Sequence, residues 1–173
     1  MDKYILGLDT SNYTTSIAVV DEQKNLLYDK RKILTVKEGE KGLRQSEAFF
    51  QHIINIPALL NEIPTSILKK ITSIGISSQP RPLPNSYMPV FRAGESFGKS
   101  FSHILGCNYV KFSHQEGHIE AAKWSLQKDF TEPFIAVHLS GGTTEILQVK
   151  ENHGNYQISI VGGTSDISTG QFI

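Results

Sequence analysis

The segment YILGLDTSNYTTSIAVV, residues 4–20, decides the fold. Two apolar, β-branched runs, 4–9 and 14–20, flank the short polar break SNY, which is the pattern of two strands joined by a turn. A third run of this kind, LLYDKRKIL at 26–34, follows the polar break DEQKN. The chain is therefore expected to open with a three-stranded meander.

Helical and strand patterns then alternate along the chain. Apolar residues recur at helical spacing between Ser46 and Ile63 and predict an amphipathic helix that bends or restarts near Pro57. The later elements are expected as a strand at 71–77, a helix at 92–105, a strand at 108–112 and a helix at 114–127. The order βββαβαβα is that of a ribonuclease-H-like α/β domain with a mixed sheet.

The last third of the chain repeats the pattern of its start. IAVHLSGGTTEILQV (135–149) has the same strand, polar turn and strand as 5–20, and a third strand-like run follows it at 156–161. We interpret this as a duplication, with a first lobe at 1–130 and the opening strands of an incomplete second lobe at 131–173. Since the second copy has no helices to cover its sheet, either the chain is the front part of a longer two-lobed protein, or another chain completes the second lobe.

The composition excludes several classes of protein. With 39% hydrophobic and 20% charged residues, the 173-residue chain is too apolar to be intrinsically disordered. Seventeen Lys and Arg balance seventeen Asp and Glu, so any RNA contact needs a local patch or a partner protein. The single cysteine, Cys107, excludes an intrachain disulfide and a multi-thiolate zinc site. No window approaches 18 apolar residues and no leader pattern opens the sequence, so we expect a cytoplasmic protein with no membrane association.

The most specific local pattern is SHQEGHIEAAKW (113–124), in which His114 and His118 are four residues apart at the start of a predicted helix. This spacing puts both imidazoles on one face, within reach of a shared metal ion. Glu116 lies roughly 200° around the helix from His114, and the order differs from the HExxH motif. Two polar residues at a capped helix start explain the same letters. The remaining histidines look isolated and are expected to be structural or surface residues: His52, His103, His138 and His153.

A glycine-rich loop lies between two predicted strands at 139–145. Its backbone N–H groups and hydroxyls, from Ser140, Gly141, Gly142 and Thr143, can converge on phosphate oxygens. A glycine-rich hairpin turn explains the same segment.

A second polar loop follows the first strand. Asp9, with Thr10 and Ser11 after it, can hold a water that is bound to a metal or a phosphate. An aspartate that begins an Asx-turn accounts for the same residues.

Taken together, LDTSNYTTSIAVVD, HQEGH and the strand–SGGTT–strand unit resemble, in order and spacing, the threonylcarbamoyl-transfer family of tRNA modification. This family is also called the O-sialoglycoprotein endopeptidase or glycoprotease family. It belongs to the superfamily of actin-like ATPases, sugar kinases and Hsp70-type ATPases, whose two duplicated lobes match the repeat described above. The resemblance covers residues 4–170 and corresponds to the first half, or somewhat more, of a family member.

The resemblance implies a divalent metal, iron or zinc, held by His114 and His118, with a further aspartate ligand beyond Ile173. It also implies that threonylcarbamoyl-adenylate, an ATP-derived nucleotide, binds between the lobes and that an adenine amino group of tRNA attacks it, with AMP as the leaving group. From its place after the first strand, Asp9 is expected to be a catalytic residue. The implied partners are tRNA, reached through partner proteins, related paralogues of the same pathway and a homodimer. The resemblance implies that Ser140, Gly141 and Gly142 hold the nucleotide or its phosphate. From their positions in the two polar loops, Thr143, Thr10 and Ser11 are expected to join them.

Three loops depart from the family pattern. DTSNYTT replaces ETSCDET, Thr143 replaces a histidine, and the proline-rich QPRPLPN replaces a glycine-rich segment. These changes indicate a divergent paralogue, for which a non-catalytic role as a binding or scaffold partner is the alternative. A metallopeptidase is less well supported, because Glu116 is displaced from the position of the general base in HExxH. We expect the full-length protein to be an enzyme and the isolated 173-residue chain to be inactive, because half of the interlobe cleft is missing from it.

Overall fold

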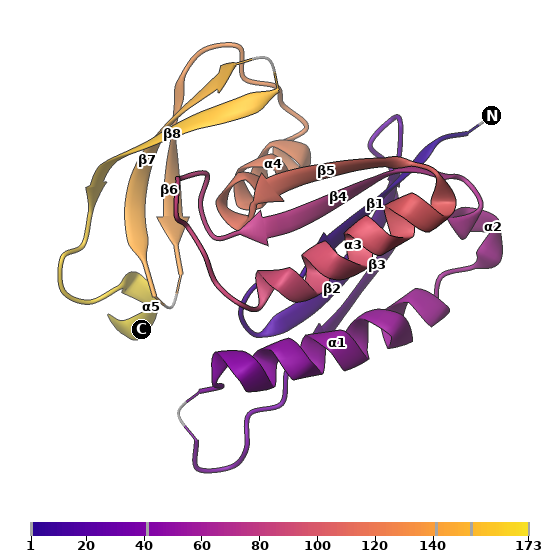
Figure 1. The fold of residues 1–173 in the computed structure, drawn as a ribbon. Coiled ribbons are helices and arrows are strands. Elements are labelled where there is room, and N and C mark those ends of the chain that lie inside the picture. Colours follow the sequence, from indigo (N-terminus) through magenta and orange to yellow (C-terminus); the bar gives the residue numbers. More distant parts are fainter. Residues whose placement is uncertain (1, 41, 141, 153, 173) are drawn as a thin grey trace. The chain divides into compact units, whose positions relative to one another are not determined.

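The computed structural model describes residues 2–40, 42–140, 142–152 and 154–172 (Figure 1). The chain forms two compact units, Met1–Gly117 and His118–Ile173, and each is described by itself. The lobe boundary expected at 130/131 concerns the sequence repeat and stays a prediction. The expected opening meander is present as β1 (Tyr4–Asp9), β2 (Thr14–Asp21) and β3 (Leu26–Ile33).

The first unit is built on a five-stranded sheet in the order β3-β2-β1-β4-β5. The meander is antiparallel, whereas β4 (Ile71–Gln79) is parallel to β1, and β5 (Asn108–Ser113) is parallel to β4. The predicted mixed sheet of a ribonuclease-H-like domain is thus confirmed. Because β1, β4 and β5 run in one direction, their carboxyl ends lie at the same edge of the sheet.

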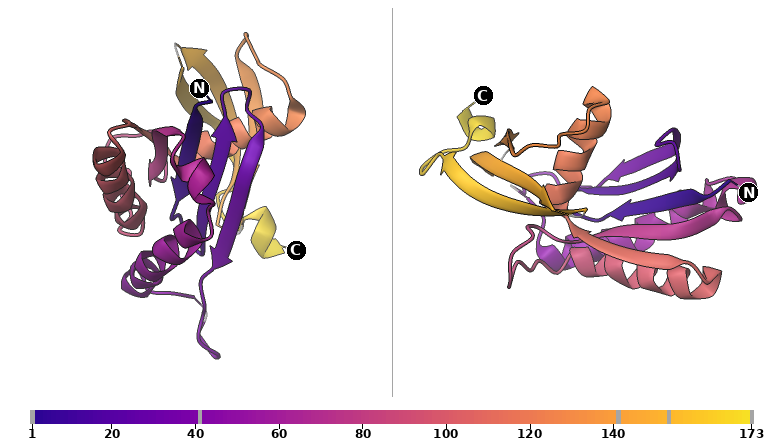
Figure 2. Two further views of the ribbon diagram at one scale, coloured as in Figure 1. Left: turned by 90° about the vertical axis from the view of Figure 1, so that its right-hand side faces the viewer. Right: turned by 90° about the horizontal axis from the view of Figure 1, so that it is seen from above.

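Two long helices, α1 (Gln45–Asn61) and α3 (Phe91–Leu105), cover one face of this sheet, and the short α2 (Thr65–Leu68) precedes β4 (Figures 1 and 2). α1 runs through Pro57 as one helix, so it does not restart there. Pro57 itself is exposed, while Ile56 and Leu59 beside it are buried and anchor the helix. None of the described helices is long and apolar enough to cross a membrane. The core between helices and sheet includes Leu6, Leu8, Ile17, Val19, Ile56, Leu59, Ile74 and Ile76.

The second unit is a three-stranded antiparallel sheet in the order β6-β7-β8, packed against α4. Ile119 of α4 is buried with Leu147 and Val149 of the sheet. The buried Lys123 of α4 places its Nζ 2.8 Å from Glu151 Oε2, which also ties the helix to the strands. The elements are α4 (His114–Leu126), β6 (Phe134–Leu139), β7 (Thr144–Asn152), β8 (Asn155–Gly163) and α5 (Thr169–Phe172).

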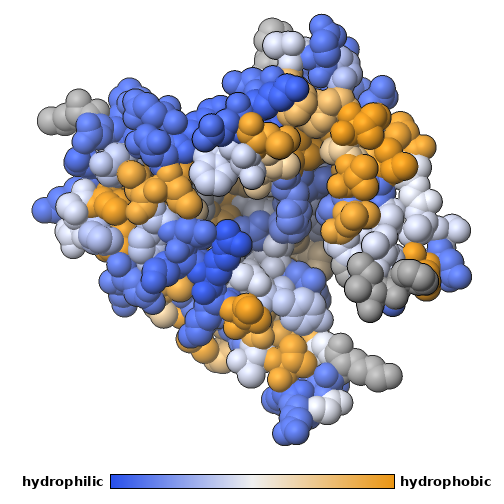
Figure 3. Space-filling view, turned by 180° about the vertical axis from the view of Figure 1, so that it is seen from behind, coloured by the Kyte–Doolittle hydropathy of each residue, from blue (hydrophilic) through white to orange (hydrophobic). Residues whose placement is uncertain are grey.

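The other face of this small sheet carries exposed apolar side chains. On β6 the exposed fractions are 58% for Ile135, 63% for Val137 and 57% for Leu139. These residues alternate with Phe134, Ala136 and His138, since successive side chains of a strand point to opposite faces. Figure 3, in which β6–β8 lie on the right, shows apolar side chains gathered over this region. The sequence-based expectation of a sheet with one uncovered face agrees with these exposures.

Candidate functional site

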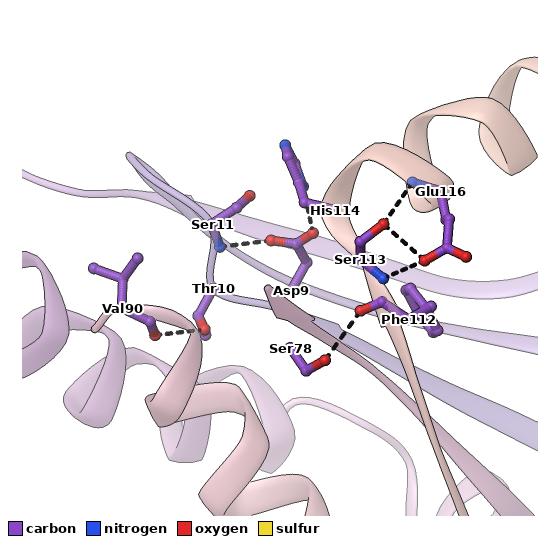
Figure 4. Close-up of polar contacts among 9 residues, drawn as sticks. All are labelled: Asp9, Thr10, Ser11, Ser78, Val90, Phe112, Ser113, His114 and Glu116. Atoms are coloured by element: carbon purple, nitrogen blue, oxygen red, sulfur yellow. Dashed lines mark hydrogen bonds and ion pairs between the residues drawn. The ribbon is translucent and has the colours of Figure 1, made fainter. Parts of the chain in front are cut away.

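The candidate site lies at the carboxyl edge of the five-stranded sheet, where β1 and β5 both end. Asp9 is the last residue of β1, and His114 follows directly after β5 as the first residue of α4. Asp9 Oδ2 lies 2.8 Å from His114 Nδ1 (Figure 4). The two residues are 105 positions apart, and the pairing of β1 with β4 and of β4 with β5 brings them together.

The second oxygen of the Asp9 carboxylate is also engaged. Asp9 Oδ1 accepts the backbone N–H of Ser11 at 2.6 Å, which is an Asx-turn. Burial alone would raise the pKa of Asp9, but the hydrogen bonds and the charge interaction with His114, together with the Ser11 N–H, hold this pKa below its ordinary value. Asp9 is therefore an ionised side chain with a partner on each oxygen.

Thr10 joins the end of β1 to the start of α3. Its hydroxyl donates to the Val90 carbonyl at 2.9 Å and accepts the Gly94 N–H at 3.2 Å. The side chain is fully buried. The two hydrogen bonds of Thr10 thus attach the loop after β1 to the start of α3. Asp9 and Ser11, on either side of Thr10 in the sequence, lie at the edge of the sheet (Figure 4).

The start of α4 is fixed by a capping box. The Ser113 hydroxyl accepts the Glu116 N–H at 3.2 Å, and Glu116 Oε2 accepts the Ser113 N–H at 2.6 Å and its hydroxyl at 2.7 Å (Figure 4). The carboxylate of Glu116 therefore stabilises the helix terminus. This agrees with the sequence argument against a metallopeptidase, in which Glu116 would have to act as a general base.

The expected helical spacing of His114 and His118 is present, because α4 begins at His114 and continues beyond His118. His118 is exposed, and its ring centroid lies 5.5 Å from that of His138 on β6. The expectation that His138 is isolated is thus wrong. Its position on the helix-facing side of β6, which strand alternation predicts, is the signal that could have found this pair. Among the described residues, no group of three or more His, Cys, Asp and Glu side chains is arranged so as to hold a metal ion.

The glycine-rich loop between β6 and β7 is closed by its own serine. The Ser140 hydroxyl oxygen accepts the N–H groups of Gly142 at 3.2 Å and of Thr143 at 2.9 Å. Ser140 also donates its backbone N–H to the Thr143 carbonyl at 2.8 Å. Gly141 lies outside the described residues. A phosphate bound here would have to replace the serine hydroxyl as acceptor of these N–H groups.

Comparison with known proteins identifies the family. Residues 38–173 match the sequence profile of the family described as tRNA N6-adenosine threonylcarbamoyltransferase. The chain belongs to this family. The enzyme of that name from Thermotoga neapolitana is 28% identical over 172 residues, which are 96% of this chain and 49% of the relative. The chain thus spans about half the length of the curated threonylcarbamoyltransferases it matches.

Solved structures show the same fold. YeaZ from Pseudomonas aeruginosa superposes with a TM-score of 0.55 at 13% identity, over 94% of this chain and 66% of YeaZ. Lmo2764 from Listeria monocytogenes, assigned as an N-acetylmannosamine kinase, gives a TM-score of 0.55 at 15% identity, over 98% of this chain and 52% of Lmo2764. The expected fold, an α/β lobe with a mixed sheet, is confirmed, and at these identities the likeness concerns the fold alone.

Proposed function

We propose that the protein carrying this chain transfers a threonylcarbamoyl group from threonylcarbamoyl-adenylate to an adenine amino group of tRNA. The observation that carries the proposal is family membership over residues 38–173, a span that includes both the histidine turn of α4 and the glycine-rich loop. In the reaction a C–N bond forms between the carbamoyl carbon and the adenine nitrogen. The C–O bond to the phosphate breaks, AMP leaves, and the nitrogen loses a proton.

The residues at the start of α4 fit a divalent metal such as iron or zinc. Neutral imidazoles are good ligands for both metals, and a ligating histidine is usually held through its other nitrogen by a carboxylate. His114 has this partner, because its Nδ1 lies 2.8 Å from Asp9 Oδ2. We propose His114 and His118 as ligands. The metal would act as a Lewis acid on the carbamoyl carbonyl.

The proposed role of Asp9 is narrower than that of a catalytic base. A base needs an oxygen directed at the proton it removes, whereas the Asp9 oxygens already accept hydrogen bonds from Ser11 and contact His114. Asp9 instead sets the orientation of the His114 ring and leaves Nε2 as the ligating nitrogen.

The glycine-rich loop is proposed to hold the adenylate. Ser140, Gly142 and Thr143 offer hydroxyl and N–H groups within one turn, and these groups now bond to each other. If these groups turned toward a phosphate, the loop would bind it as other loops bind anions, through successive backbone N–H groups. The proposed partners are tRNA as substrate and the other proteins of the same modification pathway.

The proposal is tested with the full-length natural protein. Incubated with tRNA, threonine, bicarbonate, ATP and the pathway's other proteins, it should form threonylcarbamoyladenosine, which mass spectrometry of the digested tRNA detects. A variant with His114→Ala and His118→Ala should form none, while His103→Ala, a change at an exposed residue of α3, should behave as the parent. Absence of product from the parent, where another family member gives it, would contradict the proposed function.

A further inference from the structure

The first unit contains a buried polar cluster that the proposed chemistry does not use. His52 and Asn55 lie on α1, and Thr15 lies on β2, one residue before Ser16, which pairs with Asp9 of β1. His52 and Thr15 are fully buried, and Asn55 is 4% exposed. The core around them is apolar. Burying polar side chains in such a place costs free energy unless they bond to one another, so the cluster needs an explanation.

The three side chains form one hydrogen-bonded chain with a defined direction. Thr15 Oγ1 lies 2.8 Å from His52 Nδ1, and Asn55 Nδ2 donates to Thr15 Oγ1 at 3.3 Å. Because the Thr15 oxygen accepts from Asn55, the Thr15 hydroxyl can donate its own hydrogen to His52 Nδ1. This network assigns the neutral tautomer that accepts at Nδ1 and carries its hydrogen on Nε2. Burial holds the pKa of His52 below its ordinary value, which agrees with a neutral ring.

The Nε2 end of the ring connects His52 with the turn between β1 and β2. Nε2 is buried and makes no hydrogen bond of ordinary geometry with the described residues, yet the Asn12 carbonyl is close enough to raise the pKa of the ring. Asn12 has a φ of 46°, in the left-handed region that asparagine adopts more readily than most residues. The imidazole from α1 thus acts on the turn at Asn12 as well as at Thr15.

The same turn carries the backbone group that fixes Asp9. Ser11, next to Asn12, donates its N–H to Asp9 Oδ1 at 2.6 Å. The other oxygen, Asp9 Oδ2, lies 2.8 Å from His114 Nδ1. A shift of the backbone between Asn12 and Thr15 would therefore carry the Ser11 N–H away from Asp9 and turn the carboxylate that faces His114.

We propose that His52 is a positioning residue, which holds Thr15 and Asn12 from α1 so that the β1–β2 turn presents the Ser11 N–H to Asp9. Since His52 is fully buried, it acts through the carboxylate at the end of β1 and not on a substrate. The inference rests on the proposed function for one consequence, namely that a loosened turn slows the transfer reaction.

The test compares side chains of matched shape in the full-length natural protein. Thr15→Val removes the hydroxyl and keeps the branched shape, whereas Thr15→Ser keeps the hydroxyl. His52→Leu and His52→Asn form a second pair of similar size, in which only asparagine offers an oxygen close to the position of Nδ1. Leu59→Ala, at another buried position of α1, controls for a general loss of stability. Circular dichroism confirms that each variant is folded.

Hydrogen–deuterium exchange followed by mass spectrometry measures the stability of the turn. Amides of the segment 9–16 should exchange roughly threefold to tenfold faster in Thr15→Val and His52→Leu, the factor expected for loss of one hydrogen bond. Thr15→Ser should exchange as the parent does, and His52→Asn should lie between. In Leu59→Ala the faster exchange should spread over the core. Parental exchange at 9–16 in both Thr15→Val and His52→Leu, or an increase spread evenly over the core, would overturn the inference.

Formation of threonylcarbamoyladenosine gives the second readout. At a temperature where all variants are folded, Thr15→Val and His52→Leu should slow product formation, Thr15→Ser should retain most of the rate, and Leu59→Ala should keep the parental rate. If the turn loosens and the rate does not change, His52 does not position the site, and the inference is wrong while the proposed function stands. If the parent itself forms no product, the proposed function fails, and the exchange measurement decides the inference.

Discussion

Substitution of Asp9 by asparagine separates its charge and hydrogen-bonding role from its size. The new side chain can still accept the Ser11 N–H through its amide oxygen, so the Asx-turn is retained. The group facing His114 Nδ1 changes from an acceptor to an NH₂ donor. The neutral imidazole should then accept at Nδ1 and carry its proton on Nε2, the nitrogen that must be unprotonated to bind a metal.

The magnitude follows from the kind of contact that is lost. Carboxylates that orient a ligating histidine contribute about 10- to 100-fold to metal affinity, or about 1.4 to 2.8 kcal/mol. The 2.8 Å contact of the partly buried, ionised Asp9 places the effect in this range. Asp9→Glu is the informative comparison with Asp9→Asn, because this variant keeps a carboxylate at position 9. Glutamate is also the residue that the family pattern has at this position.

The assay has two readouts. In the metal-free chain, long-range ¹H–¹⁵N spectra should show the proton of neutral His114 on Nδ1 in the parent and on Nε2 in Asp9→Asn. Zn²⁺ competition should show the weaker affinity for Asp9→Asn and a partial return for Asp9→Glu. An unchanged tautomer together with unchanged affinity would refute the reasoning, since Asp9 would then not orient the ring.

Three further predictions concern the rest of the fold. Burial lowers the pKa of His52 below the ordinary histidine value of 6.5, against the opposing influence of the Asn12 carbonyl and the Asp9 charge. As the pH falls through 6.5, the unfolded chain therefore takes up a proton on His52 before the folded chain does. Stability should therefore fall as the pH drops below about 6.5, and His52→Gln should flatten this slope in urea titrations; an equal slope would contradict it. Gly98→Ala should lower the free energy of unfolding by about 1 to 3 kcal/mol, because the new Cβ would lie 2.2 Å from Ile76 Cδ1. This loss of stability should be smaller in an Ile76→Ala background. If the losses of the two single variants simply add, the two side chains do not meet. Val137→Lys should reduce binding of the dye ANS to the exposed face of β6 and change the free energy of unfolding by no more than about 0.5 kcal/mol; undiminished dye binding would show that this face is not the apolar surface.

Local pattern was sufficient to predict most of the fold. The opening strands were predicted from apolar runs separated by polar breaks, and the structure places Leu6, Leu8, Ile17 and Val19 of the first two in the core. The helix expected at 114–127 is present as α4, and the structure adds that Ser113 and Glu116 cap its first turn. The prediction that the helix restarts near Pro57 was wrong. Helix propensity alone would interrupt the helix at a proline, but the burial of neighbouring side chains stabilises it as one helix.

The site was less accessible from the sequence. The contact between Asp9 and His114 depends on the order of three parallel strands, which no local spacing encodes. His138 looked isolated because its neighbour His118 is on a different element. For the loop at Ser140, both phosphate binding and a self-bonded turn were compatible with the same letters, and the structure shows the hydroxyl closing the turn. Tertiary contacts, and not residue types, distinguish such cases.

The metal content of the purified full-length natural protein tests the central claim most directly. After saturation with Zn²⁺ and removal of the excess by gel filtration, mass spectrometry of the metal should find about one equivalent in the parent protein, as expected for a single site. In the variant with both His114→Ala and His118→Ala, with its fold confirmed by circular dichroism, the metal should be lost. Equal metal in the two proteins, or none in the parent, would contradict the claim that the first turn of α4 binds a metal ion.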